Sequence, residues 1–317
     1  MSKPITICAG IDTGKHKLDV ALEASRERLE AGNNPAGHQA VVEWLRRHRV
    51  KRVGIEASGG YEQEIVAELR RKGFVVVLFQ PIQVRAYARF HLQRAKNDKI
   101  DAGLIAMCTA AATKIHAPPD PRLTPFARDL TLIDQISDII AGHRNRRETG
   151  GDPRIRQFWK EEIARLKKVQ KAELKRLVAA IRQYPDLAQR LDLINSVDGI
   201  GLPTAVAILV RMPEIGRISR EQAAALAGVA PYDDDSGQMV GVRHIAGGRK
   251  RLRLALYCAA LPASNRWNPQ LIALYQRLTA AGRQHKYALI ACARKLIIFA
   301  NTVVARGTPW ISQPRPA

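Results

Sequence analysis

Short apolar runs alternate with segments of helical periodicity along the first third of the chain. Segments 59–73 and 99–112 repeat apolar positions every three or four residues, which predicts amphipathic helices. The runs that predict strands are residues 5–12, 17–24, 52–57 and 74–79. Strands that alternate with helices predict an α/β domain, which we place at residues 1–115.

Local signals refine this first domain. The turn-like residues 13–16 predict a β-hairpin between the first two strands. The run FVVVLF, residues 74–79, is wholly apolar, which is typical of a strand in the middle of a sheet covered on both faces. Asn34 and Pro35 predict the N-cap and first residue of a helix, and Gly73 predicts a helix end.

Residues 116–190 predict a helical linker that begins with a proline-rich stretch. Two apolar stripes at helical spacing, separated by a break at residues 148–153, predict an antiparallel helical hairpin. Gln170 and Glu173 interrupt the heptad pattern, so we do not predict a regular coiled coil. Oligomerisation and nucleic-acid binding are both open as roles for this segment. The stripes consist of Ile133, Ile136 and Ile140, and of Ile163, Leu166, Leu174, Leu177 and Ile181.

Residues 191–317 predict a third, mainly α-helical domain. Gly199 and Gly201 precede an apolar helix and resemble the hairpin of a helix-hairpin-helix motif, in which backbone N–H groups at a helix N-terminus receive a phosphate. An ordinary glycine-rich helix connection is the alternative. Ser219 and Gln222 stand in the positions of a capping box and predict a further helix start.

The charge of the chain points to a polyanionic partner. Lys and Arg number 51 against 29 Asp and Glu, for a formal net charge of +22. A nucleic acid is the simplest such partner, and a membrane surface or a merely basic soluble protein are the alternatives. No Asp or Glu follows Asp235 in the sequence, so we expect the cations there to contact a nucleic-acid backbone. The residues assigned to this contact, with the two glycines above, are Arg243, Arg249, Lys250, Arg251 and Arg253.

Several classes of protein are disfavoured. The four cysteines form no CxxC pair, which argues against a zinc site or a disulfide scaffold. The N-terminus lacks the features of a signal peptide. The long apolar segment 287–304 has Arg294 and Lys295 in its middle, which argues against a membrane span. We therefore expect a cytoplasmic protein without a membrane partner.

Four acids in the first domain form a candidate metal site. Asp12 and Glu56 end predicted strands, and Asp98 and Asp101 are three residues apart on one face of a predicted helix. Each acid alone could cap a turn or lie on the surface. If the two strands are neighbours, however, three elements bring four carboxylates together, and a hard cation such as Mg²⁺ or Mn²⁺ offsets their repulsion.

These motifs, in this order, resemble the IS110-family transposases, the DEDD recombinases. The matching pieces are GIDTGKHKLDV, GIEASGGY and RAKNDKIDA in the first domain, and APYDDDSG with the basic tract after it in the third. Asn97 departs from the threonine usual in the third motif. The resemblance implies an RNase H-like, or RuvC-like, fold for the first domain and a C-terminal transposase domain.

The resemblance also implies roles for particular residues and partners. The metal ligands would be Asp12, Glu56, Asp98 and Asp101, and Ser236 would be a nucleophile that forms a covalent phosphoserine link to DNA. The family arranges the metal site of one subunit opposite the serine of another, in a dimer or tetramer. A structured noncoding guide RNA, the bridge RNA, pairs with both donor and target DNA in such systems.

Two other functions remain alternatives at this stage. A RuvC-like structure-selective endonuclease would use the same carboxylates with water as the nucleophile. A non-catalytic nucleic-acid-binding protein would use the acids only as helix caps.

Overall fold

The computed structural model divides the chain into two compact units, Met1–Ala117 and Pro118–Ala317. Most of the predicted linker, residues 116–190, falls in the second unit, and the three-domain division stays a prediction. The described residues are 7–23, 25, 27–57, 59–92, 98–113, 120–233, 235, 241 and 243–312, with 98–100 described for their backbone only.

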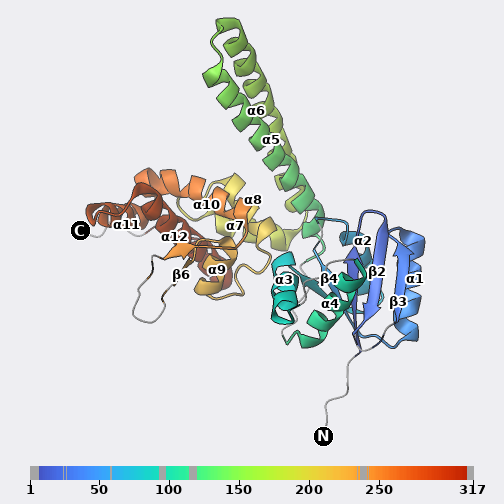
Figure 1. Ribbon diagram of the computed structural model, residues 1–317. Coiled ribbons are helices and arrows are strands. Elements are labelled where there is room, and N and C mark those ends of the chain that lie inside the picture. Colours follow the sequence, from blue (N-terminus) through green and yellow to red (C-terminus); the bar gives the residue numbers. More distant parts are fainter. Residues whose placement is uncertain are drawn as a thin grey trace. The chain divides into compact units, whose positions relative to one another are not determined.

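The first unit is built on a five-stranded mixed sheet with the strand order β3-β2-β1-β4-β5 (Figure 1). β1 pairs antiparallel with β2, and β2 antiparallel with β3, whereas β1, β4 and β5 are parallel. The strands are β1 (Cys8–Thr13), β2 (Lys17–Leu22), β3 (Arg28–Gly32), β4 (Arg52–Glu56) and β5 (Val75–Phe79).

Helices cover both faces of this sheet. α1 and α2 pack on one face around Ile11, Val20 and Ile55, and α3 and α4 pack on the other around Phe79 and Ile105. Apolar side chains alternate along the strands and so supply both cores. A mixed α/β sheet of this kind fits the expected RNase H-like domain. The helices are α1 (Pro35–Arg47), α2 (Gln63–Arg71), α3 (Pro81–Phe90) and α4 (Asp98–Ala111).

Several local predictions are confirmed in this unit. β1 and β2 form the predicted hairpin. The side chain of Asn34 accepts a hydrogen bond from the backbone N–H of Gly37 at 2.9 Å, and Pro35 begins α1. Gly73 follows α2 with a φ of 88°, the left-handed conformation that a glycine adopts at low cost.

Two predictions about the strands need correction. β5 lies at the edge of the sheet and not in its middle, and Val75 and Leu78 are each more than 40% exposed. An apolar run does not distinguish a central strand from an edge strand, because that depends on which strands pair. The sequence analysis did not predict β3, the strand at the other edge of the sheet. Arg28 and Glu30 make this strand polar, as edge strands often are.

The second unit consists of helices with one short two-stranded ribbon. α5 and α6 pack side by side as a long helical hairpin (Figure 1). Its helices are α5 (Leu123–Thr149), α6 (Pro153–Ile181), α7 (Pro185–Asn195), α8 (Leu202–Arg211), α9 (Arg220–Ala227), α10 (Lys250–Pro262), α11 (Pro269–Ala280) and α12 (His285–Arg306), with a π-helical turn at Ala263–Trp267. The ribbon pairs β6 (Pro231–Tyr232) with β7 (His244–Ile245).

The hairpin of α5 and α6 has a small core of its own. Ile136 and Ile140 of α5 pack with Ile163 and Leu166 of α6. Farther along, Gln170 donates a hydrogen bond of 2.6 Å to the hydroxyl of Ser137, a polar pair in place of an apolar contact. This pair accounts for the interruption of the heptad pattern at Gln170.

α12 is the central helix of the C-terminal bundle. Among the described residues it is the only helix that is long and apolar enough to cross a membrane by length and composition, and half of that stretch is buried in the unit. Leu289, Ala293, Leu296 and Ile297 are fully or almost fully buried in the bundle core. The apolar character of α12 is therefore used in packing.

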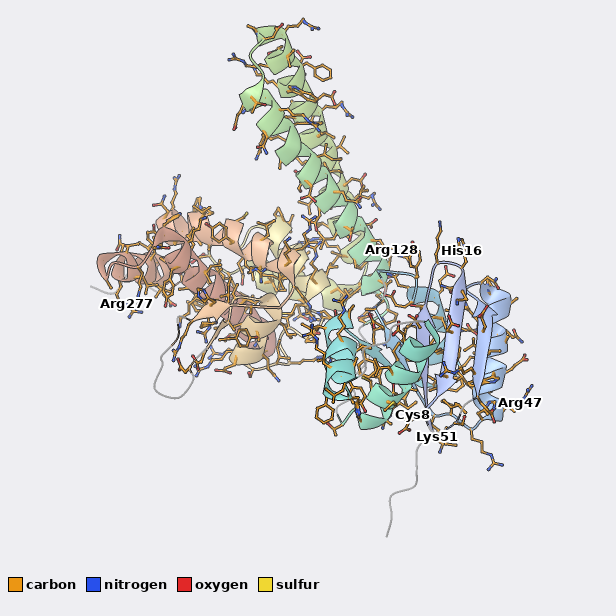
Figure 2. The ribbon with its side chains drawn as sticks, in the orientation of Figure 1. Cys8, His16, Arg47, Lys51, Arg128 and Arg277 are labelled. Carbon is orange, nitrogen blue, oxygen red and sulfur yellow. The ribbon has the colours of Figure 1, made fainter. Side chains whose placement is uncertain are left out.

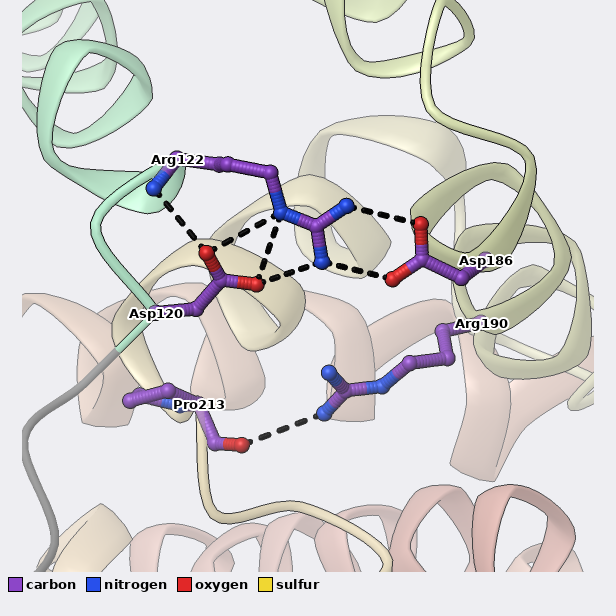
Figure 3. Close-up of polar contacts among 5 residues, drawn as sticks. All are labelled: Asp120, Arg122, Asp186, Arg190 and Pro213. Carbon is purple, nitrogen blue, oxygen red and sulfur yellow. Dashed lines mark hydrogen bonds and ion pairs between the residues drawn. The ribbon is translucent and has the colours of Figure 1, made fainter.

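Arg122 joins the start of α5 to the start of α7 (Figure 3). Its guanidinium donates hydrogen bonds to Asp186, at 2.7 and 2.9 Å, and to Asp120. Beside it, Arg190 donates to the backbone carbonyl of Pro213 at 3.2 Å. Hydrogen bonds from Arg122 hold the pKa values of both carboxyls below their usual range.

We predict that Arg122→Gln lowers stability in a pH-dependent way. Because Asp120 and Asp186 have lowered pKa values in the folded state, their stabilisation is present above the ordinary carboxyl pKa and is lost as the pH falls through the folded values. The melting temperature of the full chain should therefore drop at pH 7, and the difference from wild type should shrink towards pH 2. Arg144→Gln, at an exposed position of α5, is the control. An equal deficit at every pH would contradict the prediction.

We predict opposite effects of alanine at two glycines of the first unit. A Cβ at Gly10 would lie 2.2 Å from the carbonyl oxygen of Ala102 in α4, so Gly10→Ala should destabilise by about 1–3 kcal/mol through overpacking. At Gly103 the nearest atom is an Arg28 guanidinium nitrogen at 3.8 Å, so Gly103→Ala should stabilise by up to about 1 kcal/mol. Urea unfolding of the full chain measures both. A neutral Gly10→Ala would show that α4 does not press on the strand.

Candidate active site

Two of the predicted metal ligands lie at the ends of neighbouring parallel strands. β1 and β4 pair with Ile11 opposite Ile55, so Asp12 and Glu56 are the next residues in register. Neighbouring strands are about 4.8 Å apart, and residues in register lie on the same face. In Figure 2, Cys8 and His16 mark the two ends of the β1–β2 hairpin, and both acids belong to the His16 end.

α4 lies directly on the face that these acids share. A Cβ added at Gly10 would lie 2.2 Å from the carbonyl oxygen of Ala102, and one at Gly54 would lie 1.8 Å from the hydroxyl of Thr109. Arg52, at the start of β4, donates to the carbonyl of Thr109 at 3.4 Å. The end of the helix thus lies at the start of the strand, and α4 runs antiparallel to β1 and β4.

The first turn of α4 consequently lies at the end of the sheet where β1 and β4 terminate. This turn starts at Asp98 and includes Asp101, which immediately precedes Ala102. Burial raises the pKa of Cys108 in α4 to about 11, with a smaller contribution from the charge of Glu56, so that carboxylate is within electrostatic reach of the helix. β1, β4 and the first turn of α4 therefore meet at the same end of the sheet, as the sequence suggested.

The metal assignment itself stays a prediction. Among the side chains that the structure describes, no three His, Cys, Asp or Glu residues form a group that could hold a metal ion. The side chain of Asp98, one of the four predicted ligands, lies outside that part of the chain. The donor set consists of carboxylate oxygens only, and this chemistry suits a hard divalent cation.

The structure adds a fifth acid that the sequence analysis missed. Asp19 of β2 lies directly opposite Asp12 of β1. It is 7% exposed, and the ammonium of Lys17 is 2.9 Å from its carboxylate. Side chains opposite each other across antiparallel strands have Cβ atoms about 4.5–5.5 Å apart. Counting outward from the predicted turn at residues 13–16 places Lys17 opposite Asp12, so only the observed register of the strands identifies Asp19.

Asn33 connects the two loops that follow the acid-bearing strands. Its side-chain amide donates to the carbonyls of Gly14, at 2.9 Å, and Tyr61, at 3.0 Å. The amide oxygen is 2.8 Å from Nε2 of His38, a buried imidazole whose pKa is lowered by burial. Gly14 follows β1 and Tyr61 follows β4, so Asn33 holds the two strand ends in a fixed relation. The sequence analysis had singled out only its neighbour Asn34.

The predicted nucleophile, Ser236, lies outside the described residues. It stands in the sequence between the two strands of the β6–β7 ribbon, four residues after Tyr232. Asp233 directly follows β6 and Arg243 directly precedes β7, and the guanidinium of Arg243 is 2.5 Å from the carboxylate of Asp233. The carboxylate of Asp235 accepts a hydrogen bond of 2.9 Å from the backbone N–H of Gly241.

Three arginines of the basic tract after the ribbon have partners within the protein, and two of these partners are acids that the sequence analysis did not anticipate. Arg249 donates to Glu214 at 2.7 Å, and Arg251 donates to Asp138 in α5 at 2.8 Å. Arg253 donates to the backbone carbonyl of Gly247. These acids are distant in sequence, so a local count of charges overlooked them.

Lys250, between them, is exposed. A role of these four cations in nucleic-acid binding stays a prediction.

The predicted helix-hairpin-helix element is the connection from α7 to α8. Gly199 has a φ of 94°, and a Cβ there would lie 2.3 Å from the side chain of Ala263, so close packing alone accounts for this glycine. Gly201 is the N-cap of α8 and is exposed. Asp198 directly precedes Gly199, and its carboxylate accepts a hydrogen bond from the indole of Trp310 at 3.2 Å. Phosphate binding at this connection stays a prediction.

Two separate parts of the chain match descriptions of IS110-type transposases. Residues 9–131 match the DEDD transposases of the IS110 type, described as "Transposase", and residues 191–276 match the "Transposase IS116/IS110/IS902 family". The first match spans the sheet with its acids and α4. The second includes the β6–β7 ribbon and the basic tract.

The chain is also similar to individual proteins. The chain is 25% identical to a "Pilin gene-inverting protein" of Moraxella bovis, over 95% of this chain and 96% of that protein. It is 29% identical to an IS110 insertion element protein of Streptomyces coelicolor over 38% of this chain and 30% of that protein. A solved RuvC structure from Thermus thermophilus aligns with 32% of this chain and 92% of its own, with 20% identity and a TM-score of 0.25.

The sheet that carries the acids and the tract that follows the ribbon thus match the two characteristic parts of a single enzyme family. The chain belongs to the IS110 family of transposases, enzymes that cut and rejoin DNA.

Proposed function

We propose that this transposase is an RNA-guided, site-specific recombinase that uses Ser236 as its nucleophile and a divalent metal site for activation. The register of β1 and β4, with the first turn of α4 at their ends, is the observation that supports the metal site. The proposed ligands are Asp12, Glu56, Asp98 and Asp101.

The carboxylates of this set need a cation when they lie together. Like charges at close range raise one another's pKa and destabilise the ionised forms. Mg²⁺ or Mn²⁺, when bound, would offset that repulsion and stabilise charge on a phosphate in the transition state. The residues of this chain supply the oxygen ligands, and Asn33 fixes the two loops beside them.

The proposed serine step conserves the number of phosphoester bonds. The hydroxyl oxygen of Ser236 forms a bond to phosphorus, and the bond from phosphorus to one bridging deoxyribose oxygen breaks. The proton of the serine hydroxyl balances the charge of the departing alkoxide. Attack by a hydroxyl of another DNA end on the phosphoserine reverses this exchange and rejoins the strand, so no external energy source is required.

An oligomer would complete the site. We propose that Ser236 of one subunit faces the acids of another in a dimer or tetramer, as the family resemblance suggests. The +22 charge supports contact with the backbones of donor DNA, target DNA and a guide RNA. Aromatic residues make up only 5% of the chain, which favours recognition of the backbone over extensive base stacking.

We predict that Ser236→Ala abolishes the covalent link between protein and DNA. The variant should lose the detergent-stable adduct with labelled DNA, in the presence of Mg²⁺ and the noncoding RNA transcribed beside the gene, because no other hydroxyl replaces the nucleophile. DNA binding should be unchanged. Removal of Mg²⁺ with EDTA should also abolish the adduct in the wild type. Strand cleavage that persists in Ser236→Ala would instead support a RuvC-like nuclease that uses water.

We predict that two inactive variants restore activity when mixed. Asp12→Asn and Ser236→Ala should each be inactive alone, whereas a co-refolded or co-expressed mixture contains mixed oligomers in which an intact acid set faces an intact serine. Adduct formation and strand transfer should recover to roughly a quarter to a half of wild type, as expected from random assembly of two chains. No recovery would mean that both centres must be intact in the same subunit.

A further inference from the structure

A pocket of about 340 Å³ lies between the β6–β7 ribbon and the first half of α12. This volume is within the range of small-molecule sites, about 300–1,000 Å³. None of the acids proposed as metal ligands is among its lining residues. The lining residues are Val229, Pro231, Arg243, His244, Ile245, Lys286, Tyr287, Ile290, Ala291 and Arg294.

The polar lining of the pocket is basic. Among the described residues no acid lines it, and the nearby carboxylate of Asp233 pairs with Arg243 at a solvent-exposed position. Nε of Arg294 is buried and, within the described part of the chain, has no hydrogen-bond partner. Arg243, Lys286 and Arg294 place positive charge around the pocket, and such a lining favours an anionic ligand.

The start of α12 gives a second reason to expect an anion. His285 and Lys286 occupy the first turn of this helix, and no acid is present there. The positive end of the helix dipole disfavours a cation, because acids are the residues that stabilise that end. A phosphate beside Lys286 would reverse this unfavourable arrangement.

The remaining wall is apolar and carries an exposed aromatic ring. Val229, Ile245 and Ile290 line it, and Tyr287 is 50% exposed. The guanidinium of Arg283 lies 5.4 Å from the centre of that ring. An apolar wall with an accessible aromatic face suits a nucleobase, and the basic groups suit its phosphate.

We propose that this pocket holds one unpaired nucleotide of the DNA strand that the enzyme cuts. The base lies against Tyr287 and the apolar wall, and Lys286 and Arg294 bind the phosphate. The bases of an intact duplex are stacked inward, so only an unpaired or flipped nucleotide can enter. The choice of DNA rests on the proposed function, because the ribbon that borders the pocket brackets Ser236 in the sequence.

The test measures binding of fluorescein-labelled dT8 to the full-length protein by anisotropy at several salt concentrations. Lys286→Gln with Arg294→Gln should weaken binding at least tenfold and reduce the salt slope by about 0.7, as expected when one phosphate of a single strand is no longer neutralised. The matched control, Lys295→Gln with Arg306→Gln, removes two exposed charges from the same helix outside the pocket and should bind as wild type.

A second measurement locates the base. An octamer with one 5-iodouracil should photo-crosslink to Tyr287, as identified by mass spectrometry, and Tyr287→Ala should weaken dT8 binding about fivefold or more. An abasic octamer should be insensitive to Tyr287→Ala. Preferential crosslinking at Tyr287 of an RNA octamer with one 5-iodouracil, over the DNA octamer with the same label, would overturn the assignment to DNA.

These experiments distinguish an error in the pocket inference from an error in the proposed serine mechanism. Ser236→Ala should keep both dT8 binding and the Tyr287 crosslink, since neither requires a covalent step. If both double variants bind dT8 like the wild type, the pocket inference is wrong even where the covalent adduct forms. If the crosslink and the weakened binding are found without any adduct, the pocket is supported and the serine mechanism is wrong.

Discussion

The close contact between α4 and two glycines of the sheet determines the geometry of the candidate active site. Gly10 and Gly54 have no side chains, so the helix lies against the strands themselves, with Ala102 and Thr109 where two methyl groups would otherwise be. The parallel pairing of β1 and β4 then sets the separation of the two strand ends. Because the helix cannot approach so closely over any larger residue, the position of its first turn depends on these two missing side chains.

Charge is organised differently in the two units. In the first, acids gather at one end of the sheet in an otherwise basic chain, with Asp19 opposite Asp12. In the second, Glu214 and Asp138 engage Arg249 and Arg251, which joins the start of α10 to distant elements. These internal ion pairs leave the pocket beside α12 as a basic site without acidic lining among the described residues. The net charge alone does not distinguish clustered acids, internal ion pairs and a basic pocket from one another.

The proposed chemistry assigns distinct tasks to the two units. The sheet and α4 supply rigid positions for acidic side chains, as scaffolds of regular structure do for functional groups. The β6–β7 ribbon and α12 supply the proposed nucleophile and, by our inference, a place for the nucleotide it acts on. Strand exchange requires that DNA be held while one end replaces another, and a pocket for an unpaired nucleotide would serve that need.

Local patterns in the sequence were enough to predict the hairpin, the helix cap and the residue types of the candidate site. The β1–β2 hairpin, the Asn34 cap and the acids at the strand ends all follow from patterns within a few residues. The edge position of β5, the partners of Arg249 and the pocket at Arg294 were decided by the tertiary structure. Local patterns report backbone preference and burial, whereas pairing between distant segments depends on the energy of the whole fold, which no short stretch of sequence contains.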